Sequence, residues 1–62
     1  MADYRIYFLN NVGHIAFADW FTADSDDEAV NTVREHAHNH HRCEIWQERR
    51  LVATLNSEGR IE

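Results

Sequence analysis

Two stretches near the start of the chain are rich in apolar side chains, and a short polar segment separates them. Residues 4–9 and 14–23 contain the aromatic and β-branched residues that favour strands. The segment between them holds asparagine and glycine, which tolerate the left-handed backbone that hairpin loops require. The pattern therefore predicts a β-hairpin, closed by a three-residue loop at 11–13 with Gly13 in the left-handed conformation.

The next segment has the signature of a helix start. Ser25 followed three residues later by Glu28 matches a capping box, in which each side chain binds a backbone N–H that the first turn leaves free. Small apolar residues then recur at helical spacing. These are Ala29, Val30, Val33 and Ala37. We expect a helix from about 26 to about 40 that packs closely on a sheet.

The rest of the chain predicts a second hairpin. Residues 42–47 and 50–55 are the expected strands, with a tight turn at 48–49. Residues 56–62 are polar, and we expect them to form a flexible tail. The fold class is therefore α+β, a single ββαββ domain over 1–62 with an ordered core at about 3–55. Its antiparallel sheet has one helix packed on one face.

The loop length of the first hairpin predicts which residues face each other. With three residues in the loop, Leu9 lies opposite Ile15, Tyr7 opposite Phe17, and Arg5 opposite Asp19. On the other face, Tyr4, Ile6 and Phe8 then lie opposite Trp20, Ala18 and Ala16. Small alanines allow close approach, so we assign this second face to the helix.

The second hairpin extends both faces. We expect Cys43, Ile45 and Val52 on the helix side, and Trp46, Leu51 and Ala53 on the other. One helix about 10 Å across cannot cover four strands about 19 Å wide. An uncovered apolar area on the order of 400 Å² commonly marks an interaction surface.

The uncovered face supports the leading functional hypothesis. We interpret the chain as a protein-interaction module that forms a homodimer through the open sheet face, or that binds another protein. The expected interface residues are Tyr7, Leu9, Ile15, Phe17, Trp46 and Leu51. The alternative is a monomer whose sheet curls and whose tail covers part of the patch.

A histidine tract supports the second hypothesis. His36 and His40 are four residues apart, so on a helix both imidazoles project from one face, and they can ligate zinc or nickel. The length of the helix brings its end toward His14, with Cys43 nearby. The alternative is solvated histidines that interact favourably with the helix dipole. The chain implies no other cofactor.

Composition limits the classes of partner and the cellular locations that fit the chain. The net charge is −5 and arginine supplies every cationic side chain, so nucleic acid is an unfavoured partner. No apolar run approaches the roughly 20 residues of a membrane span. The start of the chain has no signal-peptide pattern, and the lone Cys43 suits a reducing compartment. We therefore expect a cytoplasmic protein that does not act at a membrane.

Nothing in the sequence indicates an enzyme. Cys43 alternates with Ile45 on the expected core face, which is typical of a buried thiol rather than of a nucleophile. The chain contains no phosphate-binding loop, serine triad or dinucleotide fingerprint.

Five short motifs carry a resemblance. They are YRIYFL at 4–9, GHI at 13–15, DDEA at 26–29, EIWQ at 44–47 and RLVA at 50–53. In this pattern the chain resembles a group of short uncharacterised bacterial proteins, over about residues 4–55. The resemblance implies an intracellular bacterial protein and carries over no activity or site residue. The tract from His36 to His41 departs from the pattern.

Overall fold

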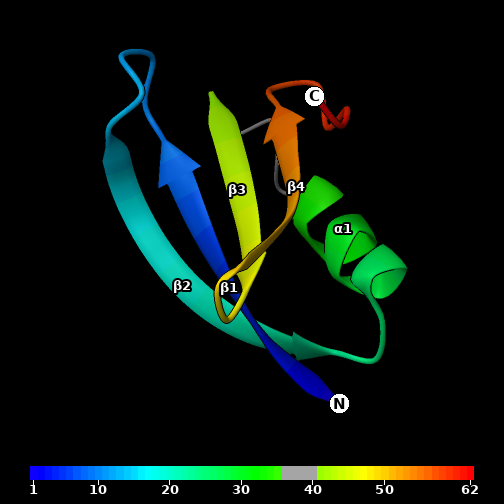
Figure 1. The fold of residues 1–62 in the computed structure, drawn as a ribbon. Coiled ribbons are helices and arrows are strands. Elements are labelled where there is room, and N and C mark those ends of the chain that lie inside the picture. Colours follow the sequence, from blue (N-terminus) through cyan, green and yellow to red (C-terminus); the bar gives the residue numbers. More distant parts are fainter. Residues whose placement is uncertain (36–40) are drawn as a thin grey trace.

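The computed structural model describes residues 1–35 and 41–62. Within them, four antiparallel strands form one sheet and one helix lies to one side of it, beside β4 (Figure 1). This confirms the α+β, ββαββ prediction. The elements are β1 (Ala2–Leu9), β2 (Ile15–Ala23), α1 (Asp26–Arg34), β3 (Arg42–Gln47) and β4 (Arg50–Asn56). The strand order is β2-β1-β3-β4, so β2 and β4 are the edge strands.

The loop of the first hairpin forms as predicted. The N–H of Asn10 donates to the carbonyl of His14 at 2.9 Å, and the N–H of Gly13 donates to the carbonyl of Asn10 at 3.0 Å. Gly13 has a φ of +85°, which glycine adopts at little cost. As expected from this loop, Leu9 lies opposite Ile15.

The pairing of the remaining residues in this hairpin differs from the prediction. The register shifts between Phe8 and Leu9, so Phe8 lies opposite Phe17 and Ala16 is an extra residue in β2. Arg5 then lies opposite Trp20 instead of Asp19. Because side chains alternate between faces, one extra residue moves everything beyond it to the other face. Phe17 and Asp19 therefore lie on the helix side, and Trp20 lies on the opposite side.

A second register shift occurs in the second hairpin. Ile45 lies opposite Ala53 and Trp46 opposite Leu51, with the shift between them. Ala53 is therefore buried on the helix side, where we had expected Val52. Val52 is the extra residue and packs, half-buried, against the core. The turn is where the sequence placed it, and Glu48 has a φ of +56°.

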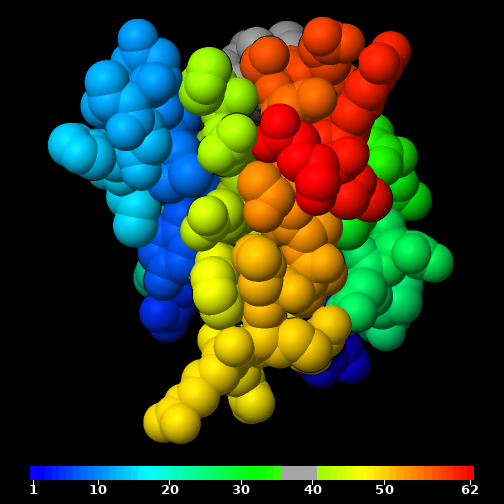
Figure 2. All heavy atoms as spheres, turned by 45° about the horizontal axis from the view of Figure 1, so that its top comes forward, coloured from blue at the N-terminus to red at the C-terminus, as the bar shows by residue number. Residues whose placement is uncertain are grey.

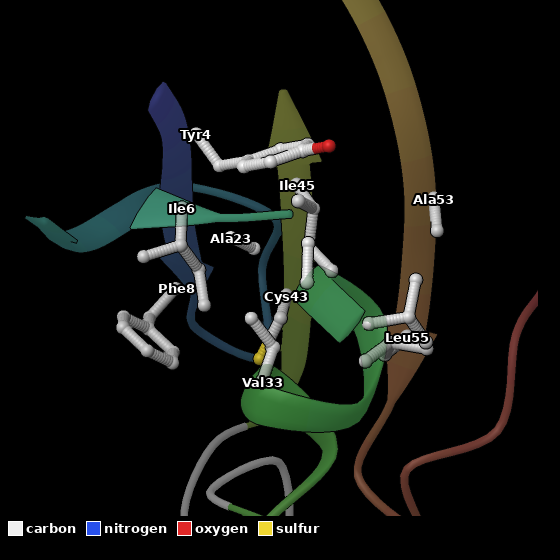
Figure 3. Close-up of a cluster of buried hydrophobic side chains, with 11 residues drawn as sticks. Tyr4, Ile6, Phe8, Ala23, Val33, Cys43, Ile45, Ala53 and Leu55 are labelled. Atoms are coloured by element: carbon white, nitrogen blue, oxygen red, sulfur yellow. The ribbon is translucent and has the colours of Figure 1, made fainter. Parts of the chain in front are cut away.

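The core lies between α1 and the facing side of β1, β3, β4 and the end of β2 (Figure 3). Its strand members are Tyr4, Ile6, Phe8, Ala23, Cys43, Ile45, Ala53 and Leu55, and its helix members are Ala29, Val30 and Val33. The helical stripe is thus confirmed over its described part. Ala16 and Ala18 are exposed, and the helix does not pack on them as we had expected. The bulge and the path of β2 carry them away from it.

The helix begins where predicted and ends earlier. The N–H of Glu28 donates to Ser25 Oγ at 3.2 Å, which confirms the N-cap. α1 ends at Arg34 with Glu35 as its C-cap, short of the predicted end near 40. Ala37 and the rest of 36–40 lie outside the described residues. No helix in the described part of the chain is long and apolar enough to cross a membrane.

The C-terminal segment, which we had expected to be frayed, follows a defined path against the end of β4 (Figure 2). Ile61 forms a bridge with Leu55, and the N–H of Glu62 donates to the carbonyl of Thr54 at 2.8 Å. Glu62 also pairs with Arg42 at 2.9 Å. This segment therefore covers part of the outer edge of β4.

Asp26, at the start of α1, forms hydrogen bonds that connect this helix to β1 and β4. Its carboxylate accepts from Tyr4 Oη at 2.8 Å, and from Arg50 Nη1 and Nη2 at 2.9 and 3.0 Å. The bonds from Arg50, and then the bond from Tyr4, hold the pKa of Asp26 below its ordinary value. Burial, reinforced by Asp26, raises the pKa of Tyr4. The start of α1 is thereby fixed to β1 and β4.

The N-cap gives a stability prediction. Ser25→Ala leaves the N–H of Glu28 without its side-chain partner, and we expect a loss of about 1 kcal/mol. For a domain of this size, Tm should fall by about 4–8 °C in calorimetry or a circular dichroism melt. Ser57→Ala, in the exposed turn after β4, is the matched control and should leave Tm unchanged. Equal shifts in both variants would contradict the assignment.

Asp26 gives a pH prediction. Its carboxylate stabilises the fold above its ordinary pKa of 3.8, and that contribution is lost as the pH falls through the lowered value. Asp26→Asn should therefore lower the urea midpoint at pH 7, and the difference from wild type should close below pH 3.8. Asp27→Asn, in the same helical turn and exposed, is the control. A difference that stays constant down to pH 2 contradicts the prediction.

Candidate protein-interaction surface

The sheet face opposite α1 carries a continuous row of large side chains. In the order of the strands the row is Trp20, Arg5, Trp46 and Leu51, each directly opposite the next. We call this side of the sheet the open face. Ordinary strand alternation brings these residues together once the two bulges have set the register.

Three further rows complete the open face, and the one nearest the start of the chain pairs Asp3 with Thr22. The second row is Ala18, Tyr7, Glu44 and Thr54, and the third is Ile15, Leu9, Arg42 and Asn56. Two open hollows, of about 640 and 340 Å³, are both lined by Arg5 and Glu48, and the larger one extends past the end of the face to Tyr4. The surface is therefore uneven, with a cation between aromatic groups near its centre.

The polar groups in the centre of the open face have few partners, whereas Arg42 at its end pairs with Glu62 at 2.9 Å. Arg5 Nη1 donates to Tyr7 Oη at 3.4 Å, which is long for a hydrogen bond. Within the described part of the chain, Arg5 takes part in no ion pair. Trp46 Nε1 donates to Glu44 Oε1 at 3.2 Å. The guanidinium of Arg5 is thus available to an acidic or aromatic group from outside the chain.

The predicted interface residues differ in how exposed they are and in which side of the sheet they lie on. On the open face, Ile15 and Leu51 are 59% and 47% exposed, Tyr7 and Trp46 are half-buried, and Leu9 is buried. Phe17 lies on the other side of the sheet, where its ring is 5.8 Å from that of Phe8. The structure therefore brings five of the six residues to one face and does not bring Phe17 there.

Sequence reasoning missed Trp20 and Arg5. Trp20 is 75% exposed, the highest value of any aromatic residue in the described chain, but the predicted register placed it under the helix. A signal for the correct face lies at the other end of β2. Ala23 is the last apolar residue before the cap at Ser25 and faces the core, and counting back by twos from Ala23 places Phe17 on the helix side.

The residues considered for metal or nucleophilic chemistry are separated or undescribed. Cys43 is fully buried, and this burial raises the pKa of its thiol. His14 lies exposed beside the first loop. In 1–35 and 41–62, no three His, Cys, Asp or Glu side chains form a group that could hold a metal ion. His36 and His40 lie outside these residues, so zinc or nickel binding there stays a prediction.

Comparison of the chain with protein-family models, with curated proteins and with solved structures finds no match. The resemblance to short bacterial proteins therefore stays a prediction, and the functional argument depends on the geometry of the chain itself.

The buried thiol gives a reactivity prediction. Because Cys43 is 0% exposed and its pKa is raised, Ellman's reagent should react only with opened molecules. We expect the reaction in buffer to be at least about a thousandfold slower than in denaturing urea. Val12→Cys, at a loop position that is 67% exposed, supplies a fast-reacting control thiol. Immediate reaction of Cys43 in buffer contradicts its placement in the core.

Proposed function

We propose that this protein is a small interaction module that self-associates through its open face. The row formed by Trp20, Arg5, Trp46 and Leu51 is the observation that supports this function most directly. Tryptophan and arginine are the residues most enriched at the energetic centres of protein interfaces. Leaving two tryptophans on one sheet face is costly for an isolated chain, and a second sheet packed on this face would bury them.

The charges of the open face favour a second copy as the partner. The face carries Arg5 and Arg42 together with Glu44, and Glu48 lies at its rim. A symmetric dimer presents the same set from both sides, so Arg5, which has no ion pair with a described residue, can meet an acidic or aromatic group of the partner. A desolvated guanidinium over an indole also gains a cation–π interaction.

The size of the face sets the expected strength. An area on the order of 400 Å² per copy is about half of what a typical stable interface takes from each partner. We therefore infer a reversible, concentration-dependent dimer rather than an obligate one.

The cysteine and the net charge also bear on the cellular location of the module and on its class of partner. We place it in the cytoplasm because its one cysteine, Cys43, is free and buried and the chain has no internal disulfide to stabilise it. An acidic chain with a net charge of −5 is unfavourable for binding to phosphate backbones, so we infer protein partners rather than nucleic acid.

Two neighbouring positions of β2 give a matched test. Ile15 and Phe17 are 59% and 55% exposed and lie on opposite sides of the sheet. Ile15→Glu places a charge in the proposed interface, whereas Phe17→Glu makes the same change of charge outside it. We expect native mass spectrometry and analytical ultracentrifugation to show a dimer for wild type and Phe17→Glu, and a monomer for Ile15→Glu.

Different results would contradict dimer formation itself or only the position of the interface. A wild-type protein that stays monomeric at all concentrations removes the proposed function. A dimer that survives Ile15→Glu, or that both variants dissociate equally, shows that the open face is not the interface. Circular dichroism of both variants checks that the fold persists.

A further inference from the structure

Exposed apolar side chains are concentrated on β2. Ile15, Phe17 and Trp20 are 59%, 55% and 75% exposed, and they project from both faces of this strand. A second copy on the open face would cover Ile15 and Trp20. It would leave Phe17 in water, because Phe17 lies on the helix side. The open face therefore does not account for all of the exposed apolar surface of this strand.

The two edges of the sheet differ in whether a described segment lies against them. The outer edge of β4 is partly occupied by the C-terminal segment, through the bridge between Leu55 and Ile61. In the described part of the chain, no strand lies on the outer edge of β2, which is nine residues long. Such an edge presents backbone N–H and C=O groups that no neighbouring strand pairs, and it can accept another strand.

Asp19 lies on this open edge. Its Oδ1 accepts the N–H of Trp20 at 2.8 Å, so this N–H is directed to the side chain. Alternate residues of a strand direct their backbone groups to the same edge, so the groups of Ala18 and Thr22 also point outward. Asp19 is the only charged residue of β2, and it has no ion pair with any described residue.

We propose that the outer edge of β2 binds an extended segment of another protein as a fifth strand, with a lysine or arginine of that segment opposite Asp19. On the helix side of β2, Asp19 lies between Phe17 and Phe21, so the incoming strand would pair its cation with the carboxylate and apolar residues with the two rings. This site goes beyond the open face and does not depend on dimer formation.

Charge excludes a second copy of β2 from this role. β2 contains no cationic residue, so pairing two β2 strands would set Asp19 against its own copy or against an uncharged residue. An acidic residue on an exposed edge is a common protection against edge-to-edge association. Asp19 thus disfavours self-pairing at the same edge where it favours a cationic strand.

Fluorescence anisotropy with two labelled peptides tests the proposal on the full-length protein. The probes are Thr-Thr-Val-Thr-Lys-Val-Val-Thr-Thr and the same peptide with glutamate in place of lysine. We expect saturable binding of the lysine peptide, and binding of the glutamate peptide weaker by on the order of fivefold or more. Asp19→Lys should reverse this preference. Asp27→Lys makes the same change of charge on α1 and should keep the wild-type preference.

Each other result overturns the proposal. Absence of saturable binding by either peptide shows that the edge does not accept a strand. Equal binding of both peptides, or a preference that Asp19→Lys leaves unchanged, shows that Asp19 does not select the partner. Native mass spectrometry of the complex supplies a separate readout. A dimer that loses its second chain as peptide binds would show that another copy occupies this edge.

Discussion

A nine-residue helix is about 14 Å long, and in this protein it is the one described element available to cover a four-stranded sheet about 19 Å wide. It lies beside β4 and shields the side of β1, β3 and β4 that forms the core (Figure 1). The described residues of α1 leave most of β2 and the opposite face of the sheet without a helix packed on them. Both proposed binding surfaces are exposed because the helix is too small to cover the sheet.

The position of the helix depends on contacts at its start. Ser25 caps the first turn, and Asp26 connects that turn to Tyr4 on β1 and to Arg50 on β4. Small residues, among them Ala23 and Ala53, let the helix approach the sheet closely. A helix fixed in this way does not reach the first half of β2, so Phe17, on the helix side of that strand, remains exposed.

The two surfaces differ in chemistry and therefore in partner. The open face combines tryptophans with charges of both signs, which suits a second copy of the same chain. The outer edge of β2 offers backbone groups and one carboxylate, Asp19, which suits an extended cationic segment. The first surface consists of side chains on a face, whereas the second consists of backbone groups along an edge and the side chains of its helix side.

Local sequence determined the elements and their start signals. The loop with Gly13, the cap at Ser25 and the turn at Glu48 depend on residues only a few positions apart, so their chemistry is readable from the chain. Alternation then correctly placed Ile6, Phe8, Cys43 and Ile45 in the core. Most of the open face, including Tyr7 and Leu51, followed from the same alternation.

Only the tertiary structure decided the rest. The extra residues Ala16 and Val52 have no local signature, because a bulge forms where both ends of a hairpin have to satisfy the core at once. The bond of Asp26 to Arg50 and the return of Ile61 to Leu55 likewise depend on where the assembled sheet brings distant segments. One extra residue inverts the faces of a strand, so Phe17, Asp19 and Trp20 reached their sides through packing of the whole sheet rather than through local preference.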